Sequence, residues 1–582
     1  TISRPTTLKL NSPTLQRKSG YRELLKSWLM YNLATKLIWK GGEDVDINAG
    51  DIERDIGILK YSPDGTKLLY ATYLGGTQNE DPHSMVVNSN LELLVFGNTG
   101  SDDFPTNINA YDSSFNGGYD IFVSRFSTDG TKLLSSTFIG GSGKDGLNGQ
   151  QVNISGGTAN SSVLGKNYGD LYRGEIIVDE DDFVYFSSVS KSDDFPITSS
   201  TYQKTRNGKH DAVVVKLDPT LSQLLGSSYI GGDDHDAAYG IALDSRKNIF
   251  ACGGTASKDM VFTTKAYQDT AQLGAIDGFI VKFSNGLDSL LAGTHFGSPM
   301  DEQCFFVQID GNDDVYVTGQ TTSDSFFLKN VKFRQPKGKQ FISKLSNSLD
   351  TLIYSGLFGS GRRNPDLSPS AFLVDQCARL YFTGWGGPPN FTGNTKGLPI
   401  PDSAKAIKSH SLNNDFYLAV FSENIDTILY ATYYGGDTSS NHVDGGTSRY
   451  DRQGIVYQSV CAGCTGLSDF PATKGVVSET NEAKTGNSCN NALFKLDFDA
   501  PVLFADFSTP EAVCFTQVIE PVDLSINALE YFWDFGDGFT SKLPNPSHQY
   551  ADSGKYTIRL IVANIYSCPG KDTFDQEIYL YR

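Results

Sequence analysis

The stretch Gly57-Ile-Leu-Lys-Tyr-Ser-Pro-Asp-Gly-Thr-Lys-Leu-Leu-Tyr-Ala-Thr-Tyr-Leu-Gly-Gly76 decides the fold, because close copies of it recur along the chain. Each copy predicts two short strands around a tight turn. In the first copy the turn contains Asp64-Gly65, a hairpin-type dipeptide, since glycine accepts a positive φ at little cost. The copies cover residues 57–76, 122–141, 213–232, 279–297, 341–359 and 418–436, and a half-copy covers 492–498.

The later copies have other residues in this turn. We expect Asp288-Ser289, Asp350-Thr351 and Asp426-Thr427 to hold the place of Asp64-Gly65. The Gly-Gly pair that closes most copies is expected to let the chain leave the strand at an angle that a Cβ would forbid. Both features predict short strands separated by sharp turns.

A second element follows each copy and repeats the order strand, turn, strand. Its clearest forms are residues 241–254 and 307–319, which have Asp-rich turns between apolar runs. Four short strands per repeating unit are typical of a β-propeller blade, so the pattern predicts an all-β propeller with six clear repeats. An Asp-Phe-Pro exit closes several of the units, at residues 103–105, 194–196 and 469–471.

The number of blades depends on the N-terminal segment. Lys36-Leu-Ile-Trp-Lys-Gly-Gly42 is a faint match to the second strand of a copy. We therefore expect residues 1–50, a basic segment, to supply a degenerate seventh blade; six blades, or further repeats upstream of this sequence, are the alternatives. The segment 1–40 carries eight Lys and Arg side chains against one acid, Glu23. A solvated leader and a docking arm for an envelope partner both fit this charge.

A different pattern begins after the half-copy. Phe532-Trp-Asp-Phe-Gly-Asp-Gly538 is followed by His548-Gln-Tyr550 and by residues 554–560. Trp533 and Phe535 fall on one strand face and Asp534 on the other, as a half-buried strand requires. The Gly-Asp-Gly run then predicts a hairpin turn, so the C-terminal region is predicted to be a separate β domain.

These motifs resemble two known families. The copies and the Asp-Phe-Pro exits resemble the SBBP (seven-bladed β-propeller) repeat over about residues 55–500. The Phe532–Gly538 motif and its followers resemble a PKD domain, which implies an immunoglobulin-like β-sandwich. The predicted domains are therefore the basic segment 1–50, an SBBP-type β-propeller at 51–500 and a PKD domain at 501–582.

Charge and hydropathy exclude some classes of partner. The net charge of −19 disfavours a nucleic-acid binder, because neutralising phosphates takes clustered Lys and Arg. No apolar run reaches the ~18 residues that a membrane-spanning helix needs.

Cysteine spacing predicts structural disulfides. Cys461-Ala-Gly-Cys464 is followed by Cys489, and we expect Cys489 to pair with one of the two. A zinc site would need a fourth ligand and a redox Cys-x-x-Cys would open a helix, so both are less favoured. Cys514 and Cys568 flank the PKD core strands and are expected to form a second bond. No partner is visible for Cys252, Cys304 and Cys377.

Acidic turns raise the question of Ca²⁺. The clusters 179–182, 233–236 and 310–314, and the pair Asp534 and Asp537, carry oxygen ligands at short spacing. The clusters lie where every repeat turns and the last lacks the distant bidentate Glu, so solvated turns are favoured and no cofactor or metal is predicted. Four Asp-(Ser/Thr)-apolar sites resemble O-glycosylation sites of Bacteroidota; their hydroxyl residues are Ser289, Thr351, Ser403 and Thr427.

No catalytic motif is present, neither a G-x-S-x-G elbow, a P-loop nor H-E-x-x-H, and we predict no enzyme activity. The resemblances imply a secreted, outer-membrane-associated surface protein of Bacteroidota, similar to gliding-motility-associated proteins exported by the type IX system. The predicted function is adhesion, scaffolding or interaction with a protein or surface glycan, with the PKD domain as spacer or interaction module. The alternatives are a glycan-binding or glycan-cleaving propeller and a subunit of a larger envelope secretion or motility assembly.

Overall fold

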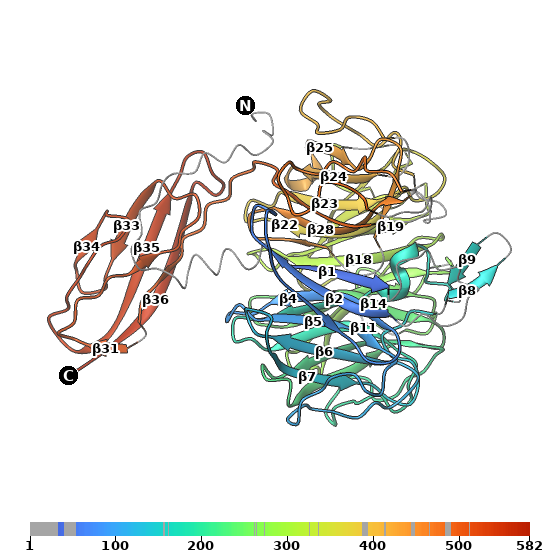
Figure 1. Ribbon diagram of the computed structural model, residues 1–582, viewed down its shortest axis with the longest axis horizontal. Coiled ribbons are helices and arrows are strands. Elements are labelled where there is room, and N and C mark those ends of the chain that lie inside the picture. Colours follow the sequence, from blue (N-terminus) through green and yellow to red (C-terminus); the bar gives the residue numbers. More distant parts are fainter. Residues whose placement is uncertain are drawn as a thin grey trace.

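The regular secondary structure of the described residues is almost entirely β-strand (Figure 1). The computed structural model describes the backbone of residues 33–39 and residues 54–582, except 150, 155–156, 161, 261, 263–264, 273, 325, 327, 334, 336, 387–393, 412–414, 444–447, 465, 483–489 and 511. Within this part, helix is limited to two short 3-10 turns, η1 (Tyr168–Tyr172) and η2 (Glu423–Ile425). The all-β prediction is confirmed; most of the segment 1–50 lies outside the described residues.

In the described part of the chain, seven sheets of three or four strands and one two-stranded hairpin precede the C-terminal domain, and sheets 2 to 6 are four-stranded antiparallel meanders. Sheet 1 is β1 (Leu33–Trp39), β2 (Arg54–Tyr61) and β3 (Leu68–Leu74); sheet 2 is β4 (Glu80–Val87), β5 (Leu93–Thr99), β6 (Asp120–Phe126) and β7 (Leu133–Ile139); sheet 3 is β10 (Glu175–Val178), β11 (Val184–Ser190), β12 (Asp211–Leu217) and β13 (Leu224–Ile230); sheet 4 is β14 (Asp236–Leu243), β15 (Ile249–Thr255), β16 (Asp277–Phe283) and β17 (Leu290–Phe296).

Sheet 5 is β18 (Glu302–Ile309), β19 (Val315–Thr321), β20 (Gln340–Leu345) and β21 (Leu352–Phe358); sheet 6 is β22 (Ser368–Val374), β23 (Leu380–Trp385), β24 (Phe416–Phe421) and β25 (Ile428–Tyr434); sheet 7 is β26 (Ser440–His442), β27 (Arg449–Tyr450), β28 (Val456–Cys464) and β29 (Asn490–Leu496). A small hairpin, β8 (Gln151–Ile154) and β9 (Gly157–Asn160), lies between sheets 2 and 3. Each complete sequence copy forms the last two strands of a sheet, and the half-copy forms β29.

The outer strand of each copied hairpin contains a β-bulge, which explains its two adjacent aliphatic residues. In sheet 6, Val420 pairs with Tyr430 and Phe421 with Ile428, so Leu429 is the extra residue. Ile428 is 6% exposed, whereas Leu429 is 40% exposed. The bulge therefore turns the second aliphatic residue outward while the first stays in the core.

The hairpin turns align differently from the sequence-based expectation. Equivalent hydrogen bonds place Leu287 at the position of Gly65, so Asp288-Ser289 corresponds to Thr66-Lys67. The left-handed residue is Gly65 in the first copy (φ 70°) and Leu287 in the fourth (φ 60°). This side chain is buried against the neighbouring sheet, and burial favours a large apolar residue despite the strain of a positive φ. The same shift holds for Asp350-Thr351, which follows the left-handed residue Leu349, and for Asp426-Thr427, which follows the left-handed residue Ile425.

These turns also join consecutive sheets. The segment between the second and third strands of one sheet donates a backbone hydrogen bond to the turn of the next. The bonds run from the N–H of Tyr111 to the carbonyl of Leu221, Tyr202 to Leu287, Tyr267 to Leu349 and Phe333 to Ile425. Val477 of sheet 7 makes the same bond to Gly65 of sheet 1, at 3.1 Å.

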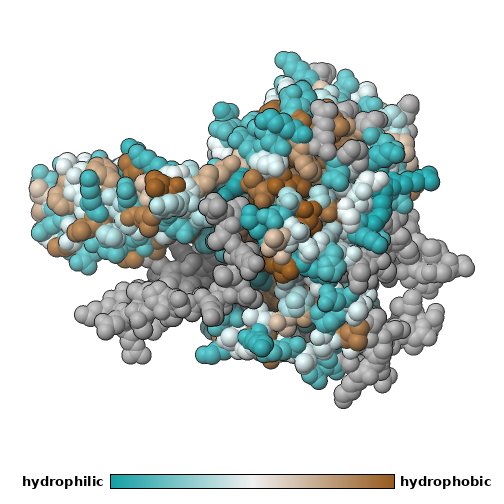
Figure 2. All heavy atoms as spheres, turned by 90° about the horizontal axis from the view of Figure 1, so that it is seen from above, coloured by the Kyte–Doolittle hydropathy of each residue, from teal (hydrophilic) through white to brown (hydrophobic). Residues whose placement is uncertain are grey.

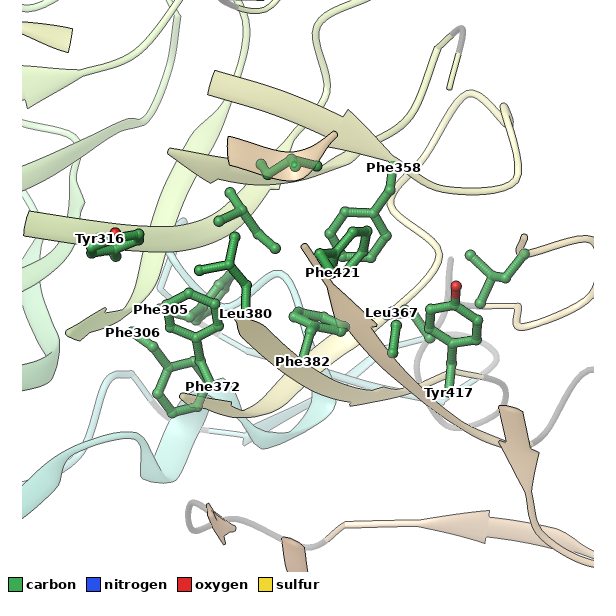
Figure 3. Packing of buried hydrophobic residues seen from close by; sticks show 14 of the residues in the cluster. Phe305, Phe306, Tyr316, Phe358, Leu367, Phe372, Leu380, Phe382, Tyr417 and Phe421 are labelled. Atoms are coloured by element: carbon green, nitrogen blue, oxygen red, sulfur yellow. The ribbon is translucent and has the colours of Figure 1, made fainter. Parts of the chain in front are cut away.

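Aromatic side chains fill the space between neighbouring sheets. Figure 3 shows Phe358 of β21, Phe382 of β23 and Phe421 of β24 pointing toward one another. Their ring centroids lie 4.9 Å (Phe358–Phe382) and 5.0 Å (Phe358–Phe421) apart. Such offset and edge-to-face contacts add to the burial of large apolar area, so each sheet is stabilised by its neighbours.

The C-terminal domain is a small β-sandwich that projects from the sheets as an arm (Figures 1 and 2). Its buried residues include Trp533, Phe535, Ile558 and Leu560, as the alternation of the sequence predicts. One layer has the order β31-β36-β35-β33-β34 and the other is β30-β32; their bounds are β30 (Phe507–Ser508), β31 (Ala512–Cys514), β32 (Val522–Asp523), β33 (Glu530–Asp534), β34 (Thr540–Ser541), β35 (Gly554–Ala563) and β36 (Lys571–Tyr581).

Candidate functional site

Two features concentrate buried polar groups: the Gly-Gly turns and the contacts of residues 162–175 with strands of sheets 5 and 6. In sheet 2 the first glycine of the turn, Gly140, lies against the buried Asp120, and a Cβ there would overlap with the Asp120 Oδ1 atom. A Cβ on Gly141 would overlap with Asp194 Oδ1. The expectation that the Gly-Gly pair serves an unusual exit angle is therefore wrong for this turn, because neither φ is positive. The glycines make room for carboxylates.

Besides the two carboxylates next to the glycines, a third acidic side chain binds the backbone of each of these turns. Asp145 accepts hydrogen bonds from the Gly141 N–H at 2.8 Å and from the hydroxyls of Ser190 and Ser192 at 2.5 and 2.8 Å. Glu80, Asp236 and Glu302 hold the same place in other sheets. Their oxygens bind backbone N–H groups and hydroxyls, so this arrangement fixes the turn.

Burial changes the acidity of these groups. Loss of solvation raises the pKa of Glu80, Asp120, Asp236 and Glu302 to about 7, because the charged form is disfavoured away from water. The pKa of Asp145 is raised to about 6 for the same reason. The turns therefore take up protons near neutral pH.

The interior contains a segment of the chain itself, residues 162–175, which we call the interior segment. Leu164 is fully buried and its carbonyl accepts a 2.8 Å hydrogen bond from Gln303 of β18. Asn167 exchanges hydrogen bonds with Gln320 of β19, at 2.9 and 3.1 Å. Nothing in the sequence pattern indicated that this stretch turns inward.

Arg173 extends the contacts of the interior segment. Its guanidinium binds Asp170 at 2.6 Å, the Ser368 hydroxyl and the Pro369 carbonyl of β22 at 3.0 Å, and lies over the Phe305 ring at 4.3 Å. The side chain is 5% exposed. The interior segment therefore links sheet 3 to sheets 5 and 6.

Arg449 makes the corresponding link from sheet 7. Its guanidinium donates to the Met85 carbonyl at 2.7 Å and to the Ser84 hydroxyl at 2.9 Å in β4, and lies 3.4 Å from the Glu175 carboxylate. Glu175 Oε2 accepts a 3.1 Å hydrogen bond from the Ile241 N–H of β14. Sheets 7, 2, 3 and 4 thus share one polar network.

The acidic turns weighed for Ca²⁺ have lysine partners. Lys247 pairs with Asp179 at 3.3 Å and with Glu180 at 3.0 Å, and it also pairs with Asp181. Lys344 lies 3.1 Å from Asp310 and 2.8 Å from Asp314, and Lys209 lies 2.8 Å from Asp234. Among the described residues no group of three or more His, Cys, Asp or Glu side chains is placed to hold a metal ion. In the PKD domain, Asp534 and Asp537 accept turn hydrogen bonds, and Asp537 also binds His548 at 2.7 Å.

The expected Cys514–Cys568 disulfide is wrong: Cys568 bonds to Cys377, with a Cα–Cα distance of 6.0 Å. Cys514 is a free cysteine that lies opposite Tyr581 at one end of β36, whereas Cys568 lies in the turn before the other end. The 11 residues of β36 span about 36 Å, far beyond the reach of a disulfide.

The remaining predicted residues lie in three settings. Cys461 is in β28, while the side chain of Cys464 and all of Cys489 lie outside the described residues, so that pairing stays a prediction. Cys252 and Cys304 are buried. The four hydroxyl residues weighed for O-glycosylation are exposed: Ser289, Thr351, Ser403 and Thr427. No described helix has the length and apolar character to cross a membrane.

The fold defines an all-β protein of repeated sheets with a C-terminal β-sandwich. A PKD domain family model matches residues 505–578, so the chain contains a PKD domain there, inside the predicted range 501–582. The PKD1 domain of the Vibrio cholerae metalloprotease PrtV is similar to this region, with 26% identity over 14% of this chain and 99% of that domain and a TM-score of 0.13.

Two solved structures are similar over more of the chain. A protein of unknown function from Dyadobacter fermentans is 12% identical over 64% of this chain and 93% of its own, with a TM-score of 0.31. An extracellular domain from B. thetaiotaomicron is 11% identical over 94% of this chain and 76% of its own, with a TM-score of 0.23. No curated protein matches this sequence.

Proposed function

We propose that the seven sheets are the blades of a closed β-propeller of the SBBP type. The support is the relation of each sheet to the next: the first strands β4, β10, β14, β18 and β22 lie side by side in this order, and β22 also lies against β27, the second strand of sheet 7. The Val477–Gly65 hydrogen bond repeats at the last and first sheets the bond found between inner pairs. β1 also lies against β28 and β4, as a strand between sheets 7 and 2 would.

We further propose that the protein is a non-catalytic interaction scaffold at the cell surface. The observation that supports this is the buried interior segment: Leu164 and Arg173 are hydrogen-bonded to β18 and β22, in the region where a propeller enzyme would hold its substrate. Binding then falls to the outer surface and to the PKD domain. The Cys377–Cys568 disulfide supports an oxidising location such as the cell exterior, and the PKD domain supports the same location.

The proposed partner is a protein or a surface glycan. Export by the type IX route, a role in gliding motility, association with the outer membrane and O-glycosylation of the exposed turns rest on the family resemblance alone. We include these four properties in the proposal as more specific expectations. A subunit role in an envelope assembly would use the same outer surface.

The test is binding of the labelled full chain to intact bacterial envelopes, combined with a search for released sugars or peptides. Saturable binding that unlabelled protein displaces, without release of product, is the expected result. Cleavage of envelope polysaccharide or protein by the pure chain would contradict the scaffold proposal. The variant Arg173→Ala tests whether the interior contacts the partner. If it does not, the variant should bind envelopes as well as the unchanged protein.

A further inference from the structure

Two covalent connections join the PKD domain to the sheets. The first is the chain itself. Phe498 packs against Tyr381 and Tyr430 between sheets 6 and 7, with ring centroids 5.7 Å apart in both cases. Leu503 is fully buried in the PKD core and Val502 is also buried, so residues 499–501 span the junction.

The second connection is the Cys377–Cys568 disulfide, whose cysteines are separated by 191 residues in the sequence. Cys377 lies in the turn between β22 and β23 of sheet 6, and Cys568 lies in the turn between β35 and β36 of the PKD domain. A bond between these turns therefore joins the two parts of the molecule directly.

Hydrogen bonds bring the two connections together. The Cys568 N–H donates to the Pro501 carbonyl at 3.1 Å, and the Leu503 N–H donates to the Cys568 carbonyl at 3.0 Å. Arg379, two residues after Cys377, donates to the Ala500 carbonyl at 3.2 Å and is held by Asp375 at 2.5 Å. The disulfide and the chain at residues 499–501 therefore lie next to each other and are joined by the same hydrogen bonds.

We propose that the Cys377–Cys568 disulfide is an orientation strap: while it is closed the PKD domain keeps one angle to the sheets, and opening it lets the domain turn about residues 499–501. A single crossing leaves two soft backbone dihedrals at Asp499 and at Ala500 and one at Pro501, whose ring fixes φ. A second covalent crossing closes a loop that most of those rotations would break. The strap is independent of the identity of the binding partner.

Opening proceeds by thiol–disulfide exchange. A thiolate of a dithiol such as dithiothreitol attacks one sulfur, the Sγ–Sγ bond breaks, and a mixed disulfide forms. The second thiol of the reagent then displaces the protein sulfur, so that both cysteines end as thiols and the reagent as its cyclic disulfide. Cys377 and Cys568 are half-buried, which leaves the bond open to a small reagent, whereas Cys252 and Cys304 are fully buried.

The experiment compares the full oxidised chain, the chain in dithiothreitol and the variant Cys377→Ser, by hydrogen exchange and by small-angle X-ray scattering. Opening the strap should raise amide exchange at Cys568, whose N–H bonds to the hinge residue Pro501, at least tenfold and broaden the distribution of distances between the two parts. Exchange at Ile558 and Leu560, in the PKD core, should stay unchanged. The control Cys514→Ser, which removes a free cysteine of the same domain, should behave as the oxidised protein.

Unchanged exchange and scattering after opening would overturn the proposal, because contacts alone would then fix the angle. Loss of protection across β35 would overturn it as well, because the bond would then maintain the fold of the PKD domain instead of its orientation. The variant Cys568→Ser keeps the test valid if Cys377→Ser does not fold, because it opens the same bond and leaves the predicted Cys489 pairing closed, which dithiothreitol would also reduce.

Discussion

The guanidinium of Arg449 in β27 lies 3.4 Å from the carboxylate of Glu175 in β10, so one ion pair connects sheet 7 with sheet 3. Glu175 is 7% exposed at its side chain and Arg449 is 31% exposed. Since sheets 7 and 3 are distant in the sequence, this pair holds together parts of the fold that no local strand pairing joins.

Removing Arg449 should destabilise the protein more than removing a surface arginine. Arg449→Ala leaves the Glu175 carboxylate without its cation and the Met85 carbonyl without a donor, and we expect a loss of about 2 kcal/mol in urea unfolding. The matched control is Arg559→Ala, which breaks an exposed, solvent-screened pair with Asp575 and should cost clearly less stability than Arg449→Ala. Equal losses for the two variants would show that the buried network contributes no more than a surface pair.

The close contact between Gly140 and Asp120 predicts that a side chain at position 140 destabilises the protein. Gly140→Ala places a methyl group onto Asp120 Oδ1, so we expect a loss of about 2 kcal/mol or more in the free energy of unfolding. Gly311→Ala is the matched control, because a Cβ there meets no atom within 4 Å, and its effect should stay within about 0.5 kcal/mol. A neutral Gly140→Ala would mean that the turn can move away from the carboxylate.

The buried acids predict how stability depends on pH. Glu80, Asp120, Asp236 and Glu302 have folded pKa values of about 7, above the ordinary carboxyl value near 4 of the unfolded chain. Their contribution is fully present below pH 4 and is lost as the pH rises through 7, since the folded state binds more protons. The melting temperature should therefore fall between pH 5 and pH 8.

Glu302→Gln provides the control for this slope. An amide does not titrate, so the variant should show a smaller fall in melting temperature over the same range. Melting temperatures that rise from pH 5 to pH 8 would contradict the assigned pKa directions.

Glycosylation of the four exposed hydroxyl residues can be tested by mass spectrometry of the natively expressed protein. We expect glycan mass on peptides that contain Ser289, Thr351, Ser403 or Thr427, all of which are exposed. The variant Ser289→Ala should lose the mass from its own peptide only. Unmodified peptides at all four sites would remove this part of the proposal.

The strand order within a sheet could be predicted because each sheet is local in sequence: a hairpin of about 20 residues follows another, and only the turn between them needs special residues. The turn alignment failed at Leu287 because tertiary burial outweighs the local preference for glycine at a positive φ. The same logic explains why Trp533 and Phe535 were placed correctly: their alternation is a local signal of a buried face.

Long-range contacts could not be predicted in this way. Nothing near Cys377 in the sequence indicates a partner 191 residues away, and the nearer Cys514 misled the assignment. The inward course of the interior segment depends on polar pairs such as Asn167 with Gln320, whose residues have no common motif. Single polar residues carry no periodicity, so the filled interior becomes visible only in three dimensions.

If the protein is an interaction scaffold, its partners bind the outer surface and leave the buried interior segment untouched. Hydroxyl-radical footprinting of the full chain, free and bound to intact envelopes, distinguishes these two locations. Binding should protect side chains exposed on the outer surface, such as Tyr73 or Leu429, and leave the low labelling of Leu164 and Leu171 unchanged. A change in labelling at Leu164 and Leu171, with the outer surface unaffected, would contradict the account and point to an interior binding site.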